Sequence, residues 1–173
     1  MDETGNLISR FELCRDDVMA EFATISTDNG YRTAGVKVVN AIRRQDHIIQ
    51  SLTTGQAEIG IQVGNVDVEG QGTNWQSFDA KADIWVQAVI KTDSSSSDAS
   101  VTLNTALEGL RHDCLRIVNS LTMKYMNNFK GRWNILKSPI KTVVTTDLGG
   151  KDNIGAVGVK FQAHLRFMHG TFK

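Results

Sequence analysis

The C-terminal stretch NIGAVGVKFQAHLRFMHG, residues 153–170, carries a long alternating pattern. Apolar residues occupy every second position from Val157 to Phe167, and mainly polar or small residues lie between them. A period of two is typical of a β-strand with one face toward a core and the other toward solvent. Strands usually run about five or six residues, so this terminal strand is predicted to be unusually long. Phe161 is expected in the core and Lys160 on the solvated face.

Three further segments have strand patterns, and the chemistry of the turns between them predicts how they connect. They are YRTAGVKVVN (31–40), AEIGIQVGNVDVE (57–69) and ADIWVQAVIK (82–91). The alternation slips by one residue at Gly64 and Asn65, which predicts a β-bulge or tight bend. IKTVVTTDL (140–148) and the turn GGKDN (149–153) predict a terminal hairpin with the last strand. The stretch from Asn40 to Gln56 is ambiguous, and a short helix within AIRRQDHIIQSLTTG (41–55) is one interpretation of it.

Two segments have the spacing of amphipathic helices, with apolar residues at steps of three and four. In the first, the stripe contains Leu7, Phe11, Cys14, Val18, Phe22 and Ile25. In the second, it contains Leu103, Leu107, Leu110, Cys114, Ile117, Leu121 and Tyr125. Ser9 with Glu12, and Thr105 with Glu108, fit capping boxes at helix starts.

The order of these elements predicts the fold class. Helix, three strands, helix and two strands favour a single α+β domain over residues 1–173. We expect a mainly antiparallel β-sheet with a long terminal hairpin and two main α-helices packed on one face. The Ser-rich stretch TDSSSSDAS (92–100) is interpreted as a linker into the second helix.

The composition excludes several classes of protein. Nineteen basic residues balance nineteen acidic ones, so nothing favours a polyanion-binding surface. No apolar run approaches the roughly 20 residues that span a bilayer, and the acidic N-terminal stretch does not resemble a signal peptide. Cys14 and Cys114 lie on helix stripes and are interpreted as buried free thiols without function.

Motifs that carry chemistry are weak in this sequence. LGGKD (148–152) lacks the Ser or Thr that follows the lysine of a phosphate-binding loop, so it is interpreted as a turn. The four histidines have no zinc-ligand spacing. Asp67 and Glu69 could hold a cation on one strand face, but a solvated rim is the preferred interpretation. We therefore expect no catalytic residues, no metal and no cofactor.

The polar stretch from Gly70 to Lys81 is interpreted as a twelve-residue loop between two strands. Hairpin loops usually have two to five residues, and loops on rigid scaffolds often carry recognition. The loop contains two aromatic residues, Trp75 and Phe78, which would either fold over the core or contact a partner. We name Trp75 and Phe78 as the candidate partner-contact residues.

This layout resembles the tail terminator proteins of long-tailed (siphovirus-type) bacteriophages. The likeness lies in five features and covers almost the whole chain: NLISRFELCRDDVMAEF (6–22), the central hairpin with its polar loop (59–91), the Ser-rich linker, LNTALEGLRHDCLRIVNSL (103–121) and the last strand. The stretch from Asn40 to Gln56 departs from the family pattern.

The resemblance implies a structural role and no enzymatic activity. Such proteins form a hexameric ring that ends the tail tube and offers an attachment surface to the head-completion or neck protein. The implied location is the head-proximal end of the virion tail, after synthesis in the host cytoplasm, with no membrane partner. DNA would pass through the lumen without specific binding, and a near-neutral chain is compatible with this.

Two alternative functions remain open at this point. The chain could be another ring protein of the phage neck or tail, such as a head–tail joining or minor tail protein. It could also be a small α+β enzyme or ligand-binding domain whose site is assembled from residues distant in sequence. A ring predicts a hexamer in solution, whereas an enzyme predicts a monomer or dimer with a deep pocket.

Overall fold

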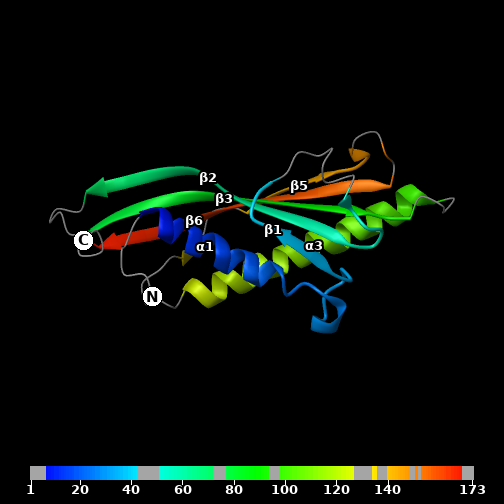
Figure 1. Cartoon of the computed structure of the whole chain (residues 1–173), viewed down its shortest axis with the longest axis horizontal. Coiled ribbons are helices and arrows are strands. Elements are labelled where there is room, and N and C mark those ends of the chain that lie inside the picture. Colours follow the sequence, from blue (N-terminus) through cyan, green and yellow to red (C-terminus); the bar gives the residue numbers. More distant parts are fainter. Residues whose placement is uncertain are drawn as a thin grey trace.

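The computed structural model describes residues 7–42, 51–71, 77–93, 98–126, 134–135, 140–148, 151 and 153–168. These residues form an α+β fold in which helices and strands follow the expected order (Figure 1). The elements are α1 (Leu7–Phe22), a short 3-10 helix η1 (Thr27–Asn29), β1 (Val36–Val39), β2 (Ala57–Gln71), β3 (Ser77–Lys91), α3 (Ala99–Met126), β4 (Asn134–Ile135), β5 (Lys141–Thr145) and β6 (Ile154–Met168). The predicted fold class is confirmed.

Three strands of 15 residues each, β2, β3 and β6, form the frame of a mixed sheet. Strand β6 pairs antiparallel with β3 along its whole length, from Ile154 opposite Lys91 to Met168 opposite Ser77. On the other side of β3, β2 is antiparallel, and β1 is parallel to β2. The terminal strand is therefore long because it pairs with β3 over the full length of that strand.

The hairpins agree with the sequence patterns. Strand β5 pairs antiparallel with β6, with Lys141 opposite Lys160 and Thr145 opposite Ala156, which confirms the terminal hairpin. The register between β2 and β3 shifts by one residue between Val63 and Val66. This shift is the β-bulge predicted at Gly64 and Asn65.

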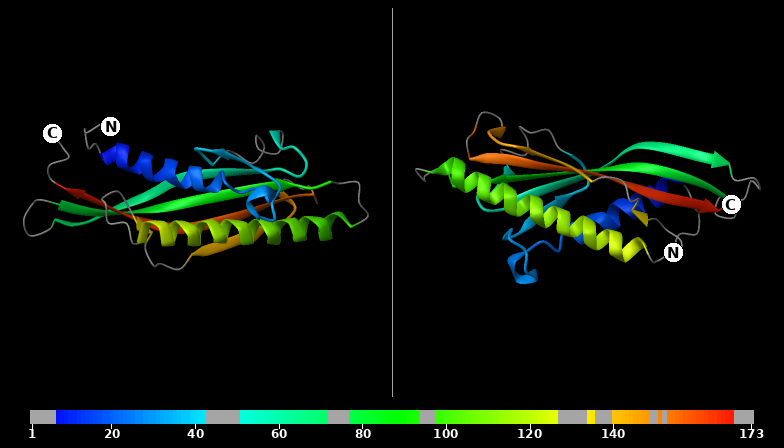
Figure 2. Two further views of the ribbon diagram at one scale, coloured as in Figure 1. Left: turned by 90° about the horizontal axis from the view of Figure 1, so that it is seen from below. Right: turned by 180° about the vertical axis from the view of Figure 1, so that it is seen from behind.

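Both helices cover the same face of the sheet and form one layer over it (Figure 2). The predicted stripes point into the core: Cys14, Val18 and Phe22 of α1 are at most 1% exposed. In α3 the buried stripe consists of Leu103, Leu107, Leu110, Cys114, Ile117 and Leu121. Neither predicted capping box lies at a helix start, because α1 begins at Leu7 and α3 begins at Ala99.

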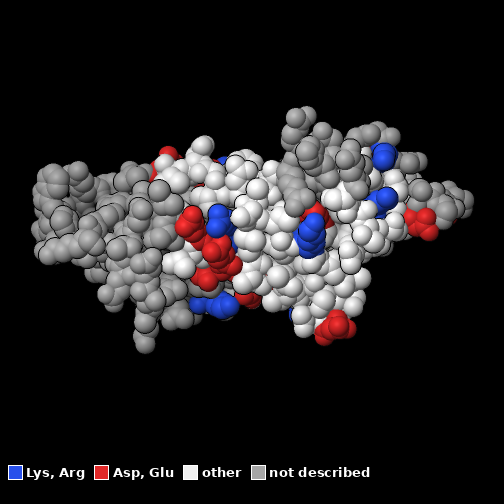
Figure 3. Space-filling model, viewed as in Figure 1, with Lys and Arg blue, Asp and Glu red and all other residues white. Residues whose placement is uncertain are grey.

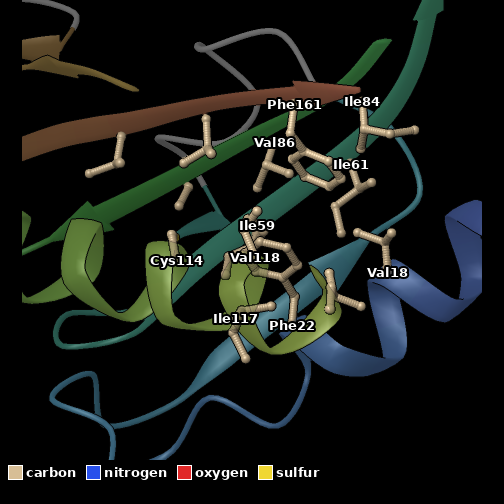
Figure 4. Close-up of a cluster of buried hydrophobic side chains, with 14 of the residues drawn as sticks. Val18, Phe22, Ile59, Ile61, Ile84, Val86, Cys114, Ile117, Val118 and Phe161 are labelled. Atoms are coloured by element: carbon tan, nitrogen blue, oxygen red, sulfur yellow. The ribbon is translucent and has the colours of Figure 1, made fainter. Parts of the chain in front are cut away.

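The core forms where these helices meet alternate residues of the three long strands. Phe161 of β6 is 1% exposed and lies close to Ile84 of β3 and Ile61 of β2, with Phe22 of α1 below them (Figure 4). Burying a side chain of this size contributes about 1.5–3 kcal/mol relative to leaving it in water. The apolar residues at every second position from Val157 to Leu165 are therefore buried in the core, as the alternation predicts.

The opposite, outer face of the sheet has a smaller apolar cluster at one end. Val89, Ile154 and Ala156 pack there with Leu148, and Leu52 covers them. At Gly60 the chain crosses this face so closely that a Cβ atom would lie 2.7 Å from the carbonyl oxygen of Ala41. Both described ends of the ambiguous Asn40–Gln56 stretch therefore lie on the outer face, and residues 43–50 fall outside the described part.

The interpretation of residues 70–81 as a long loop is wrong. Strand β2 continues to Gln71 and β3 begins at Ser77, with Gln71 opposite Phe78. The polar composition of this stretch hid the strands, because both ends of the hairpin extend beyond the apolar alternation. Pairing with β3 continues across a second register shift, between Glu69 and Gln71, and sustains strand structure that the sequence pattern does not signal.

Candidate interaction surfaces

The edges of the sheet are the first candidate surface. Strand β6 is interior over most of its length, because β5 pairs with Ala156–Lys160 and β4 pairs with Ala163 and His164 on the side away from β3. The short strands β1 and β4 end the sheet, and two further edges without a partner strand among the described residues belong to β2 and β5. In the described part of the chain, β1 pairs with β2 only as far as Gly60, and no strand pairs with the outer side of β5.

The β5 edge exposes apolar side chains. Val143 is 64% exposed, and Ile140 and Val144 are more than one third exposed. Strand β5 belongs to the sheet through β6 alone, so its outer backbone N–H and C=O groups face away from the sheet. An exposed apolar edge of this kind is a template for pairing with another strand.

Two apolar side chains are exposed near the bulge of β2, on opposite faces of the sheet. Val66 is 38% exposed, and the indole of Trp85 from β3 lies over Gly64 and remains 43% exposed. A Cβ atom at Gly64 would lie 2.5 Å from the indole Nε1, so any other residue there would displace the ring. Trp85 was not singled out from the sequence, although it occupies a solvent-facing position of a strongly alternating strand.

A polar cluster fixes Trp85 on the outer face. The Nζ atom of Lys160 lies 2.7 Å from Oδ2 of Asp83 and 4.6 Å from the centre of a Trp85 ring. Gln162 donates a second hydrogen bond to Asp83, at 3.0 Å. The expectation that Lys160 is simply solvated is therefore wrong, because pairing across β3 and β6 brings a carboxylate and an aromatic ring to its ammonium group.

The hydrogen bond from Lys160 holds the pKa of Asp83 below its ordinary value. The lowered pKa means that the folded state favours the ionised carboxylate. Stability from this pair is therefore present above the unfolded-state pKa, about 3.9, and is lost as the pH falls through the folded-state value.

We expect Lys160→Met to destabilise the protein more at pH 7 than at pH 3. Removing the ammonium group raises the pKa of folded Asp83 toward its ordinary value. The parent protein then loses more of its free energy of unfolding between pH 7 and pH 3 than the variant does, so the two proteins differ less at pH 3. Urea unfolding of both proteins at the two pH values measures the difference. An equal difference at both values would show that the ion pair does not contribute to folding.

A second candidate surface is the segment from Ser26 to Gly35, which projects beyond the helical layer (Figure 1). Helix α3 holds this segment in place. Asp113, which is fully buried, accepts hydrogen bonds at Oδ2 from the backbone N–H groups of Arg32 and Thr33 and from Thr33 Oγ1, at 2.8–3.0 Å. Arg116 donates to the carbonyl oxygen of Gly30 at 2.8 Å. These bonds make the projection a fixed part of the scaffold.

A cavity of about 580 Å³ lies between this segment, the end of β3 and the first turns of α3. Among the described residues that line it, Arg32 carries a charge and the other polar groups are mainly threonines. Thr33 and Thr92 donate their hydroxyl protons to Asp113 and to the Asn153 carbonyl oxygen, respectively. These two hydroxyl groups are therefore engaged in hydrogen bonds within the protein.

Both cysteines are buried free thiols. Burial raises the pKa of the Cys14 thiol well above its ordinary value and that of Cys114 to about 12, so both thiols stay protonated and unreactive. This agrees with their predicted burial. Among the described residues, no group of three or more His, Cys, Asp or Glu side chains could hold a metal ion. Asp67 is exposed, which agrees with a solvated position.

Of the two candidate contact residues, Phe78 belongs to a strand. It is part of β3, between Gln71 of β2 and Phe167 of β6. Trp75 lies outside the described residues. Trp85, also on β3, is an exposed aromatic residue in the described part of the chain.

Charge is distributed unevenly on the face that carries α1. Acidic side chains gather over this helix, with Arg15 bonded to Asp16 and Lys124 bonded to Glu21 (Figure 3). The described lysines and arginines on this face are scattered and do not form a stripe (Figure 3). The described residues of this face therefore form no basic stripe of the kind that tracks a nucleic-acid backbone (Figure 3).

Among the described helices, none is long and apolar enough to cross a membrane. Comparison of the chain with models of protein families and with curated protein sequences finds no match.

Proposed function

We propose that this chain is a structural virion protein that forms a hexameric ring at the head-proximal end of a phage tail. Its role would be to terminate the tail tube and to present an attachment surface to the neck or head-completion protein. The proposal rests first on the resemblance to tail terminator proteins in the order of helices, long strands and linker. It requires no cofactor and no catalytic residue.

The observation that carries the proposal is the presence of two different open edges on opposite sides of one sheet. The edge of β2 beyond Gly60 and the edge of β5 expose apolar side chains, yet they have different sequences and lengths. A contact between two different surfaces is heterologous, and it generates a ring when the rotation closes. A monomer with two such edges would be prone to uncontrolled association, whereas a closed ring covers both edges.

Solution mass and electron microscopy test this function. The purified chain, examined over a range of concentrations, is expected to give a species of six times 19.1 kDa and ring-shaped particles in negative stain. Mixing it with tail tubes of a long-tailed phage should place a cap at one tube end. A chain that stays monomeric or dimeric at all concentrations and does not cap tubes would favour a small enzyme or ligand-binding domain instead.

A further inference from the structure

We propose that the outer edge of β5 in one subunit adds to the open edge of β2 in the next, so that the sheet continues around the ring. This inference rests on the proposed ring and names the contact that builds it. The partner is a second copy of this chain, and main-chain hydrogen bonds between strands would supply much of the affinity.

Exposed apolar side chains support this pairing. Eight large apolar side chains are exposed in the described part of the chain, and four of them lie on β2 or on and next to β5. These four are Val66, Ile140, Val143 and Val144. Exposed apolar side chains at unpaired edges mark interaction sites, and pairing of β5 with β2 would bring those of the two strands into one contact.

The charged residues favour pairing of β5 with β2 over pairing of either strand with its own copy in another subunit. The open β2 segment, residues 61–71, contains Asp67 and Glu69 and no basic residue, whereas residues 140–145 contain Lys141 and no acidic residue. Two β2 edges would bring like charges together, which is destabilising. Of the three possible combinations, pairing β5 with β2 is the one that brings opposite charges together.

The bulge in β2 restricts where β5 can pair. The register shift between Val63 and Val66 interrupts the regular hydrogen-bonding edge. A further irregularity lies between Glu69 and Gln71, so the regular part of this edge beyond the bulge runs from Val66 to Glu69. Strand β5 has five residues, Lys141–Thr145, with Val143 at its centre. We therefore place Val143 of one subunit close to Val66 and Asp67 of the next.

Cysteine cross-linking of the full chain tests this contact. Residues opposite each other in paired strands lie within disulfide reach. Two double variants are compared: Val143→Cys with Val66→Cys, and Val143→Cys with Asp67→Cys. Under mild oxidation, at least one of these two variants is expected to give a ladder of covalent species of up to six chains. The native thiols are buried and provide no competing cross-link.

Two controls distinguish the possible contacts. Val143→Cys combined with Asn119→Cys, an exposed position on α3, should give no ladder. Val143→Cys alone should give no covalent dimer, and such a dimer would show that β5 pairs with its own copy and would overturn the inference. In a mixing experiment, one set of chains carries only Val143→Cys and the other carries only Val66→Cys or only Asp67→Cys. The mixture should give covalent dimers and nothing larger, because each chain has a single thiol at the contact.

A charge exchange provides a second measurement. Lys141→Glu is expected to raise the subunit concentration needed for ring assembly roughly tenfold. Adding Asp67→Lys should restore assembly at the original concentration. Rings without ladders and without charge rescue would overturn the edge pairing and leave the proposed function intact. Absence of rings and of tube capping in the unmodified protein would contradict the function itself.

Discussion

Replacing Phe161 with alanine is expected to lower the free energy of unfolding by about 3–5 kcal/mol. The ring is 1% exposed and lies where α1, β2 and β3 meet β6, so its removal leaves a cavity that the surrounding residues cannot fill without moving. Urea unfolding of the two proteins, at a concentration where both have the same oligomeric state, measures the difference. This would be a large fraction of the stability of a typical domain.

Met123→Ala is the matched control for this truncation. Met123 is apolar but 62% exposed on α3, so its removal should change the free energy of unfolding by no more than about 0.5 kcal/mol. Similar and small losses in both variants would mean that the region around Phe161 is not a packed core. A large loss at Met123 alone would mean that α3 is covered by another part of the chain.

Asp113→Ala is expected to cost about 3–5 kcal/mol, because three donors lose their acceptor at once. The carboxylate is fully buried, and Thr33, whose N–H and hydroxyl groups donate hydrogen bonds to it, is buried as well. Hydrogen exchange at the Arg32 and Thr33 amides should become faster in the variant, since the segment from Ser26 to Gly35 would no longer be fixed to α3. A loss below about 1 kcal/mol, with unchanged exchange, would contradict this role.

Asp113→Asn separates hydrogen bonding from charge. The amide oxygen can replace Oδ2 and keep the three hydrogen bonds, while the NH₂ group takes the place of Oδ1. Oδ1 accepts no hydrogen bond from the described residues and lies 3.5 Å from Nδ1 of His112. We therefore expect a loss of only about 1–2 kcal/mol, from weaker bonds to a neutral acceptor. Equal losses for the alanine and asparagine variants would show that the negative charge is the essential property.

Asp113 also shows what sequence reasoning missed and how it could have been found. It lies three positions after Leu110 and next to Cys114, so the helical spacing places it on the buried stripe of α3. An acidic residue on an apolar stripe requires a hydrogen-bonding partner. The partners, Arg32 and Thr33, are about 80 residues away in sequence, and only the packing of the projecting segment against α3 identifies them.

The sequence by itself determined the elements whose signal is local. The alternation around Phe161, the stripes of both helices and the phase slip at Gly64 are all read within a few residues, because side-chain direction follows backbone periodicity. These features were sufficient for the fold class and for most of the core. They were insufficient for residues 70–81, where polar side chains occupy paired strands.

The tertiary structure alone decided which strand edges are open. The terminal strand and its hairpin with β5 were predicted from the sequence pattern, whereas its other neighbours were not: β3 pairs with one side of β6, and β4 joins β5 on the other. Strand pairing depends on backbone groups that every residue carries, so the side-chain pattern says which face is buried and not which strand is the neighbour. For the same reason, the contacts of Lys160 with Asp83 and Trp85 became visible only once β3 and β6 were in register.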